Sequence, residues 1–184
     1  MDSNRTFFTF LVCVIALLSC SKKIAIPFRP NAYDADSLKT GEWVYYYDEY
    51  FDIIEKAKKA TYYRLVTFEK GEPVGEMGDY YANGKPQMVG RLLSENPEIF
   101  EGKSTYYGEN EYVVGIEYSQ KGVVDHRKSL EELRIVYEEW PEDKEQISDY
   151  LLLLSNLADL YIYNIQYEEA ESLYLEVVAI QKRT

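Results

Sequence analysis

The rarest side chains of this 184-residue sequence that could do covalent or acid–base chemistry are two cysteines and one histidine. Cys13 and Cys20 lie near the N-terminus, and His126 is the only histidine. A thiol can act as a nucleophile or carry a covalent group, and an imidazole can act as a general base. Because no serine or cysteine motif accompanies His126, which falls at a predicted helix start, we interpret it as a polar residue near the helix cap.

Acidic side chains form the other candidate clusters. Three glutamate pairs stand within predicted helices and are interpreted as solvated helix faces: Glu131-Glu132, Glu138-Glu139 and Glu168-Glu169. The sequence has no calcium-loop pattern, no zinc-binding cluster of histidine and cysteine, and no glycine-rich phosphate loop. We therefore predict no metal, no cofactor and no enzymatic activity.

Cys20 stands at the end of an apolar segment. Residues 1–6 are mostly polar, and residues 7–18 form an apolar run that only Thr9 interrupts. This run is shorter than the roughly 20 residues that span a bilayer, and it fits the apolar region of a secretory signal. The alternatives are an ordinary signal peptide with a chance cysteine, or a buried apolar helix.

The segment Leu17-Leu18-Ser19-Cys20 resembles the lipobox of bacterial lipoproteins. The resemblance implies cleavage before Cys20, a diacylglycerol on its thiol and acylation of its amine, and two or three acyl chains anchor a protein stably. We therefore expect residues 1–19 to be a signal peptide and residues 20–36 to be a lipidated tether to the membrane. By resemblance to retention signals, the lack of aspartate at Ser21 favours the outer membrane, facing the periplasm.

Charge and composition restrict the partners. Lysine and arginine number 20 against 32 aspartates and glutamates, a net charge of -12, so we expect no nucleic-acid partner. The 19 tyrosines fit strands with one wet face rather than a disordered acidic tail. If Cys13 leaves with the signal and Cys20 is lipidated, no thiol remains for a disulfide.

Residues 37–124 contain a recurring unit of a glycine, a polar spacer, an aromatic pair and a turn. The unit begins at Gly41, Gly78 and Gly102, and strand-like segments such as residues 62–68 lie between its copies. Asn83-Gly84 and residues 70–73 predict turns. Short strands at regular spacing predict an antiparallel β-meander.

The units at residues 41–47, 78–90 and 102–118 resemble MORN-type repeats of bacterial exported proteins. The resemblance implies a curled antiparallel sheet that contacts proteins or lipids. The turn of the repeat is altered at Asp48-Glu49 and Asn110-Glu111, which predicts a longer loop at either place, or a short helix over residues 48–59. Within each tyrosine pair we expect one ring to pack and its neighbour to be wet.

Residues 125–184 have a helical period instead. A first stripe consists of Leu130, Leu133, Val136 and Tyr137, and residues 147–163 and 167–182 predict two further helices. Residues 151–184 resemble a tetratricopeptide repeat (TPR) of the kinesin-light-chain kind. The resemblance places seven residues in the packing of this hairpin: Leu154, Leu157, Ala158, Tyr161, Tyr167, Ala170 and Tyr174.

These features predict an α+β protein, in which an antiparallel β-meander of MORN-like repeats precedes a helix and a TPR-like hairpin. We expect a membrane-anchored scaffold of the bacterial cell envelope that binds protein partners through the β-module and the helical groove. The alternative is the regulatory N-terminal part of a longer protein with a C-terminal, caspase-like peptidase domain. One repeat cannot bury both of its faces, so we expect further repeats, packing on the sheet, or self-association into a homo-oligomer.

The lipid assignment predicts the behaviour of Cys20→Ala. Because this thiol is the only expected acylation point, the variant should be unprocessed or soluble, and it should take up no fatty acid during metabolic labelling. Cys13→Ala is the matched control and should be labelled like the parent chain. Label retained by Cys20→Ala would contradict the assignment.

Overall fold

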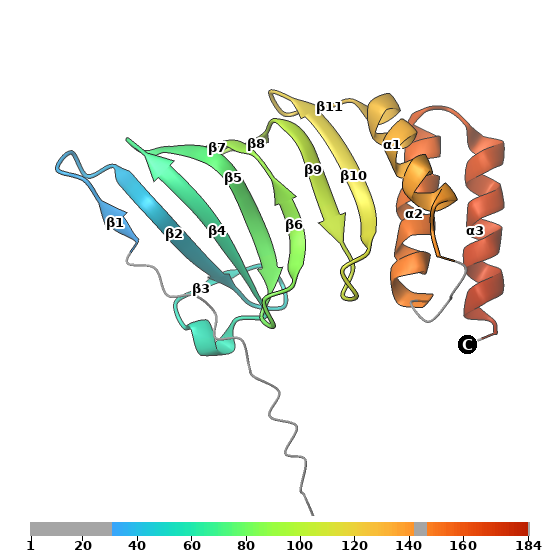
Figure 1. The fold of residues 1–184 in the computed structure, drawn as a ribbon, viewed down its shortest axis with the longest axis horizontal. Helices are drawn as coiled ribbons and strands as arrows, with labels where there is room; N and C mark the ends of the chain where they lie inside the picture. Colours follow the sequence, from blue (N-terminus) through green and yellow to red (C-terminus); the bar gives the residue numbers. More distant parts are fainter. Residues whose placement is uncertain (1–30, 142–146, 184) are drawn as a thin grey trace, which may run out of the picture.

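The computed structural model describes residues 31–141 and 147–183, which form a nine-stranded antiparallel sheet followed by three helices (Figure 1). The strand order is β1-β2-β4-β5-β6-β9-β10-β11, with β3 paired to β2, and a separate hairpin consists of β7 and β8. The predicted α+β class and antiparallel meander are therefore confirmed. The strands are β1 (Ala32–Tyr33), β2 (Lys39–Tyr47), β3 (Ile53–Ile54), β4 (Tyr62–Glu69), β5 (Glu72–Tyr81), β6 (Pro86–Gly90), β7 (Leu92–Glu95), β8 (Glu98–Phe100), β9 (Gly102–Tyr107), β10 (Val113–Gln120) and β11 (Val123–Val124).

Tight turns join the neighbouring strands of the meander. Lys70 and Gly71, between β4 and β5, both have positive φ (49° and 82°), as a two-residue hairpin turn of right-handed twist requires. At the predicted Asn83-Gly84 turn only Gly84 has positive φ (87°), and its N–H donates to the Tyr81 carbonyl at 2.8 Å. The turn between β5 and β6 thus contains one residue in the left-handed conformation. From the Asn-Gly sequence alone, both residues could have adopted it.

The two faces of the sheet are covered differently. Alternate residues share a face, and the cross-strand register places Trp43, Val66 and Met77 on one of them. This Trp43 face carries a core with Phe68 and Met88, and Leu92 of the β7–β8 hairpin packs over it. The opposite face carries the stacked rings of Tyr63 and Tyr80, 5.2 Å apart, and is called the Tyr63 face.

The segment between β2 and β4 makes an excursion from the meander. It contains β3 and a three-residue 3-10 turn, Ala57–Lys59, so the alternative of a helix over residues 48–59 is wrong and the longer loop is what the chain forms. The Asp48 carboxylate explains the local preference, because it accepts the N–H groups of Tyr50 and Asp52 at 2.9 and 3.1 Å. Such side-chain bonds compete with helix formation.

The sheet begins within the predicted tether. The Asn31 side chain pairs with the backbone of Val44, donating to its carbonyl and accepting its N–H, both at 2.9 Å. β1 then pairs with β2 through Ala32 and Tyr33. The folded part therefore starts upstream of the boundary predicted at residue 37. Short pairings of this kind carry little periodicity of their own in the sequence.

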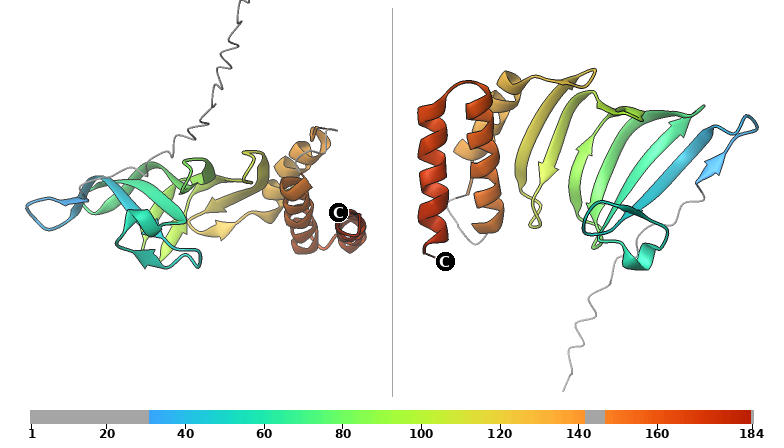
Figure 2. Two further views of the ribbon diagram at one scale, coloured as in Figure 1. Left: turned by 90° about the horizontal axis from the view of Figure 1, so that it is seen from below. Right: turned by 180° about the vertical axis from the view of Figure 1, so that it is seen from behind.

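Three helices, α1 (His126–Glu138), α2 (Ile147–Tyr163) and α3 (Tyr167–Gln181), follow the sheet. The bounds of α2 and α3 agree with the predicted helices to within one residue. α1 begins after Asp125, whose carboxylate caps it by accepting the Lys128 N–H at 3.1 Å. The helices lie at one end of the sheet, beyond β10, rather than over either face (Figure 2). Their shared core joins α1, α2, α3 and Ile116 of β10.

Side chains of the helices pair with the backbone of β10. The Ser129 hydroxyl of α1 accepts the Tyr118 N–H at 2.9 Å, and the Asn156 amide of α2 donates to the Val114 carbonyl at 2.8 Å. An unpaired strand edge would otherwise recruit another chain. Of the three expected environments for the helices, packing on the sheet is therefore the one seen for α1 and α2.

A third contact connects the β9–β10 turn with the start of α2. Asp149 is 3% exposed and accepts the backbone N–H and the side-chain amide of Asn110 at 3.1 and 3.3 Å. Its carboxylate lies over Gly108, where an added Cβ would approach the Asp149 Cγ to 2.2 Å. Glycine is required at this position by the close approach of the helix.

This close approach predicts a coupled pair of variants. Gly108→Ala should destabilise the protein by about 1 to 3 kcal/mol, because the added methyl group overlaps the Asp149 carboxylate. Asp149→Ala should also destabilise it, by leaving the Asn110 donors unpaired. In the double variant the methyl group occupies the vacated space, so the loss in urea denaturation should be smaller than the sum of the two. Strictly additive losses would show that the two residues do not interact.

Candidate functional site

The predicted site of lipidation, Cys20, lies outside the described residues, together with the predicted signal peptide and most of the predicted tether. Within residues 31–141 and 147–183, no helix has the length and apolar character needed to cross a membrane. The same residues contain no group of three or more histidine, cysteine, aspartate or glutamate side chains placed to hold a metal ion.

His126 is the first residue of α1 and lies against an aromatic ring rather than a nucleophile. Its imidazole stacks on Tyr163 of α2, with ring centroids 4.2 Å apart and planes 6° from parallel. The buried Nδ1 atom has no hydrogen-bond partner among the described residues. The neighbouring backbone is also held, since the Asn164 amide donates to the His126 carbonyl at 3.0 Å. His126 thus helps to fix α1 against α2.

The predicted acidic helix faces are exposed with one exception. Glu132 of α1 pairs with Lys103 of β9 at 2.7 Å and accepts the Tyr118 hydroxyl. Lys103 and then the Tyr118 hydroxyl lower the pKa of the Glu132 carboxyl. Glu132 therefore joins α1 to the sheet, whereas Glu131, Glu138, Glu139, Glu168 and Glu169 are exposed.

The seven predicted packing residues separate into two groups. Leu154, Leu157, Ala158 and Ala170 are buried in the helical core, and Tyr161 is half-buried against it. Tyr167 and Tyr174 are 61% and 37% exposed. The core-packing role predicted for these two residues is therefore corrected, because neither belongs to the buried core. The contact face of α3 is instead formed by Ala170 and Leu173, because α3 meets a single partner helix and turns its other side outward.

A buried ion pair joins the Trp43 face to the β7–β8 hairpin. Arg64 of β4 is 9% exposed and donates to both carboxylate oxygens of Asp79, at 2.7 and 2.9 Å. A further guanidinium nitrogen pairs with Glu98 of β8. Bidentate geometry of this kind fixes both partners. Sequence reasoning missed Arg64, although a charged residue within an apolar strand was a signal.

A row of aromatic rings lies along the Trp43 face, where the segment between β2 and β4 leads into β4. Phe51 stacks on Tyr62 with centroids 4.4 Å apart, and Tyr62 lies 5.7 Å from Tyr81. The division expected within the tyrosine pairs of the repeat units is not seen, because Tyr80-Tyr81 and Tyr106-Tyr107 are all half-buried. Between the units, Tyr63 is buried and Tyr62 is less so. Both faces of the sheet are covered in part.

The row ends at a cavity of about 570 Å³, the sheet–helix cavity, between the Trp43 face and α2. Its walls come from β9, β10, the start of α1 and one side of α2, and Tyr81 stands at the junction with the aromatic row. Volumes of this size are typical of small-ligand and side-chain sites. The lining consists of Tyr81, Gln87, Tyr106, Tyr107, Val114, Gly115, Ile116, Glu117, Val124, His126, Leu133, Leu152, Asn156, Asp159, Leu160 and Tyr163.

A second hollow, the α2–α3 groove, lies between α2 and α3. It has a volume of about 340 Å³ and is lined by Ile162, Tyr167, Ala170, Glu171, Tyr174, Leu175 and Val178. The Tyr174 hydroxyl donates to Asp159, which lines the sheet–helix cavity, so one hydrogen bond connects the walls of the two hollows. Leu175, 63% exposed, is the most exposed aliphatic side chain of the groove.

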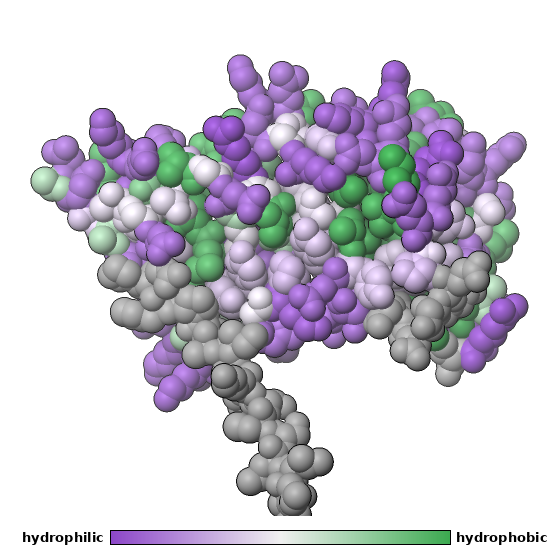
Figure 3. Space-filling model, viewed as in Figure 1, coloured by the Kyte–Doolittle hydropathy of each residue, from purple (hydrophilic) through white to green (hydrophobic). Residues whose placement is uncertain are grey.

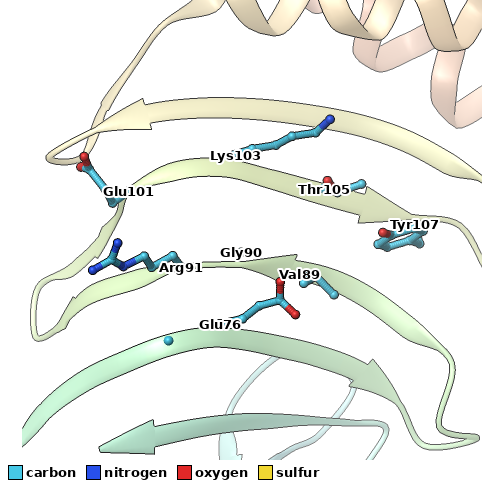
Figure 4. Close-up of a pocket in the computed structure, with 9 residues that line it drawn as sticks. Glu76, Val89, Gly90, Arg91, Glu101, Lys103, Thr105 and Tyr107 are labelled. Carbon is cyan, nitrogen blue, oxygen red and sulfur yellow. The ribbon is translucent and has the colours of Figure 1, made fainter. Parts of the chain in front are cut away.

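A third hollow of about 450 Å³ lies on the Tyr63 face (Figure 4). Its charged side chains are Glu76, Arg91, Glu101 and Lys103, which are spread along the strands and do not converge on one point. On the side of the molecule drawn in Figure 3, hydrophobic residues occur in small groups among hydrophilic ones. The two hollows lined by α2 are therefore the better candidates for a binding site.

Searches against protein-family models, curated proteins and solved structures each find no match. The functional assignment consequently depends on the geometry of these hollows and on the sequence motifs.

The distribution of burial in the hairpin predicts a contrast between two substitutions. Ala170→Leu should lower the stability of the protein by about 1 to 3 kcal/mol, because Ala170 is buried in the core shared with α2 and a larger side chain would overpack it. Tyr167→Ala should change it by less than about 0.5 kcal/mol, because this ring is mostly in water. Thermal melting followed by helical circular dichroism measures both. Equal losses would contradict the assigned contact face of α3.

Proposed function

We propose that this protein is a lipid-anchored interaction module of the bacterial cell envelope, which binds protein partners at the α2 end of its sheet. The lipobox-like segment before Cys20 supports the anchor, and the resemblance of the strand units to MORN-type repeats supports a role in contacts. The proposal assigns no catalytic step to the chain.

One observation carries this proposal: α2 contributes to both the sheet–helix cavity and the α2–α3 groove, and the hydrogen bond from Tyr174 to Asp159 joins their walls. Leu152 and Tyr163 contribute apolar surface to the cavity, while Leu175 and Val178 contribute it to the groove. Exposed apolar side chains gathered around hollows are typical of surfaces that contact other proteins. The contacts of α1 and α2 with the sheet hold both helices in place, so the surface is formed before a partner arrives.

The helical hairpin supports a TPR-like groove as the finer form of this proposal. α2 and α3 pack against each other through Leu157, Ala158 and Ala170, all of which are buried. Small residues at that contact let two helices approach closely, as the resemblance to a TPR implies. The exposed side of the pair then offers Tyr167 and Tyr174 to a partner rather than to the core.

Photocrosslinking from single positions in growing cells tests the proposal. A photoreactive amino acid would replace Leu152 in the cavity, Leu175 in the groove, or Val123 in β11 as a control of high exposure. We expect the same crosslinked species from Leu152 and Leu175 and none from Val123. A species of twice the chain mass would identify a second copy as the partner.

Crosslinks that form equally from all three positions, or from Val123 alone, would contradict the assignment of the surface. A Cys20→Ala background separates the anchor from the binding surface. If the anchor only localises the protein, the purified variant should still bind the crosslinked partner with unchanged affinity.

A further inference from the structure

The geometry points to a subsite for an organic cation within the sheet–helix cavity, which takes the arginine or lysine side chain of a partner peptide. This inference rests on the proposed function and names the chemistry of the partner at that same surface. It is carried by the charges and rings of the cavity.

The charged side chains of the cavity lining are acidic. Glu117 projects from β10 and Asp159 from α2, so the carboxylates come from two different walls. No lysine or arginine is present among the residues that line the cavity. A cavity with one sign of charge concentrates ligands of the opposite sign.

Both carboxylates have neutral hydrogen-bond partners in the described part of the chain. Glu117 accepts the Ser119 hydroxyl at 3.2 Å, and Asp159 accepts the Tyr174 hydroxyl. Neither carboxylate pairs with a cation within residues 31–141 and 147–183, whereas nearby acidic residues such as Glu132 and Asp79 do. A hydroxyl donor orients a carboxylate without neutralising it, so both negative charges remain available to a ligand.

Aromatic rings complete the environment of a cation. Tyr81, Tyr106 and Tyr163 line the cavity beside the carboxylates. Burial raises the pKa of the Tyr106 hydroxyl to about 12, and the negative charges of Glu117, Asp79 and Glu98 contribute to this rise. The faces of tyrosine rings attract guanidinium and ammonium groups.

Gly115 allows Asn156 and Tyr106 to lie close against the backbone of β10. A Cβ at this position would lie 3.3 Å from both the Asn156 Nδ2 and the Tyr106 Cβ, so a larger residue would push these side chains away. Its backbone has no positive φ, and glycine is therefore not needed there for conformation. The absent side chain therefore brings Asn156 and Tyr106 together beside β10, and both residues line the cavity.

An organic cation fits this lining better than a metal ion. Two carboxylates on separate walls do not make a ligand set, and the described residues contain no group of three or more potential metal ligands. Apolar and aromatic side chains such as Leu152 and Tyr163 instead match the hydrocarbon stem of a basic side chain.

The test is a titration of the full chain in detergent micelles, followed by NMR. The probe is acetyl-glycyl-arginyl-glycine amide, and the control peptide carries citrulline, which has the same shape without the charge. We expect saturable shifts at Gly115, Asn156 and Tyr163, with the citrulline peptide binding at least about tenfold more weakly. Equal binding of the two peptides, shifts confined to other regions, or no saturable binding would overturn the inference.

Matched variants test whether the negative charges of the two cavity carboxylates bind the arginine peptide. Glu117→Gln with Asp159→Asn retains the shape of both side chains and an oxygen acceptor on each, and it should weaken the arginine peptide at least about tenfold. Glu69→Gln removes an exposed carboxylate elsewhere on the sheet and should leave the affinity unchanged. An equal effect of Glu69→Gln would show that only net charge matters, against a defined subsite.

N-propylguanidine, which has the stem and single charge of an arginine side chain without a peptide backbone, distinguishes the source of the cation. It should bind more weakly than the peptide, and equal or tighter binding would overturn the peptide assignment. The outcome is separable from that of the photocrosslinking experiment. Crosslinks at Leu152 and Leu175 without binding of the arginine probe would contradict the cation subsite while leaving the interaction surface in place.

Discussion

An edge strand presents backbone groups that need partners, and in this protein the helices supply some of them for β10. The Ser129 hydroxyl and the Asn156 amide take up one N–H and one carbonyl of that strand, and the buried Asp149 holds the neighbouring turn. These polar contacts come from α1 and α2, while the apolar core they surround includes Ile116 of the sheet. The position of every helix relative to the sheet depends on this closure.

The candidate surface is a consequence of the same docking. Because α2 stands at the end of the sheet rather than over a face, one of its sides remains turned toward the Trp43 face, and a cavity lies in the angle between them. Neighbouring acidic residues are paired with cations elsewhere, since Asp79 binds Arg64 and Glu132 binds Lys103. Glu117 and Asp159 accept hydrogen bonds from hydroxyl groups instead, so their negative charge is retained at the cavity.

Local signals accounted for much of the fold. The turn at Lys70 and Gly71, the bounds of α2 and α3, and the alternation along β4 follow from conformational preference and periodicity, which act between residues close in sequence. Contacts between distant residues were less accessible. The pairing of Asn31 with Val44 and of Arg64 with Glu98 joins residues 13 and 34 positions apart, and no local pattern specifies such partners.

The amino-acid sequence by itself determined the class of the protein, the order of its elements and the apolar stripes of its helices, because these depend on periods of two or 3.6 residues. Tertiary structure decided which side of each stripe met a partner. It turned Tyr167 outward, buried Asp149, and gave Asn156, a polar residue within an apolar run, the role of pairing with a strand backbone. The cavity also belongs to this second group, since Tyr106, Glu117 and Asp159 come together only when β9, β10 and α2 have packed.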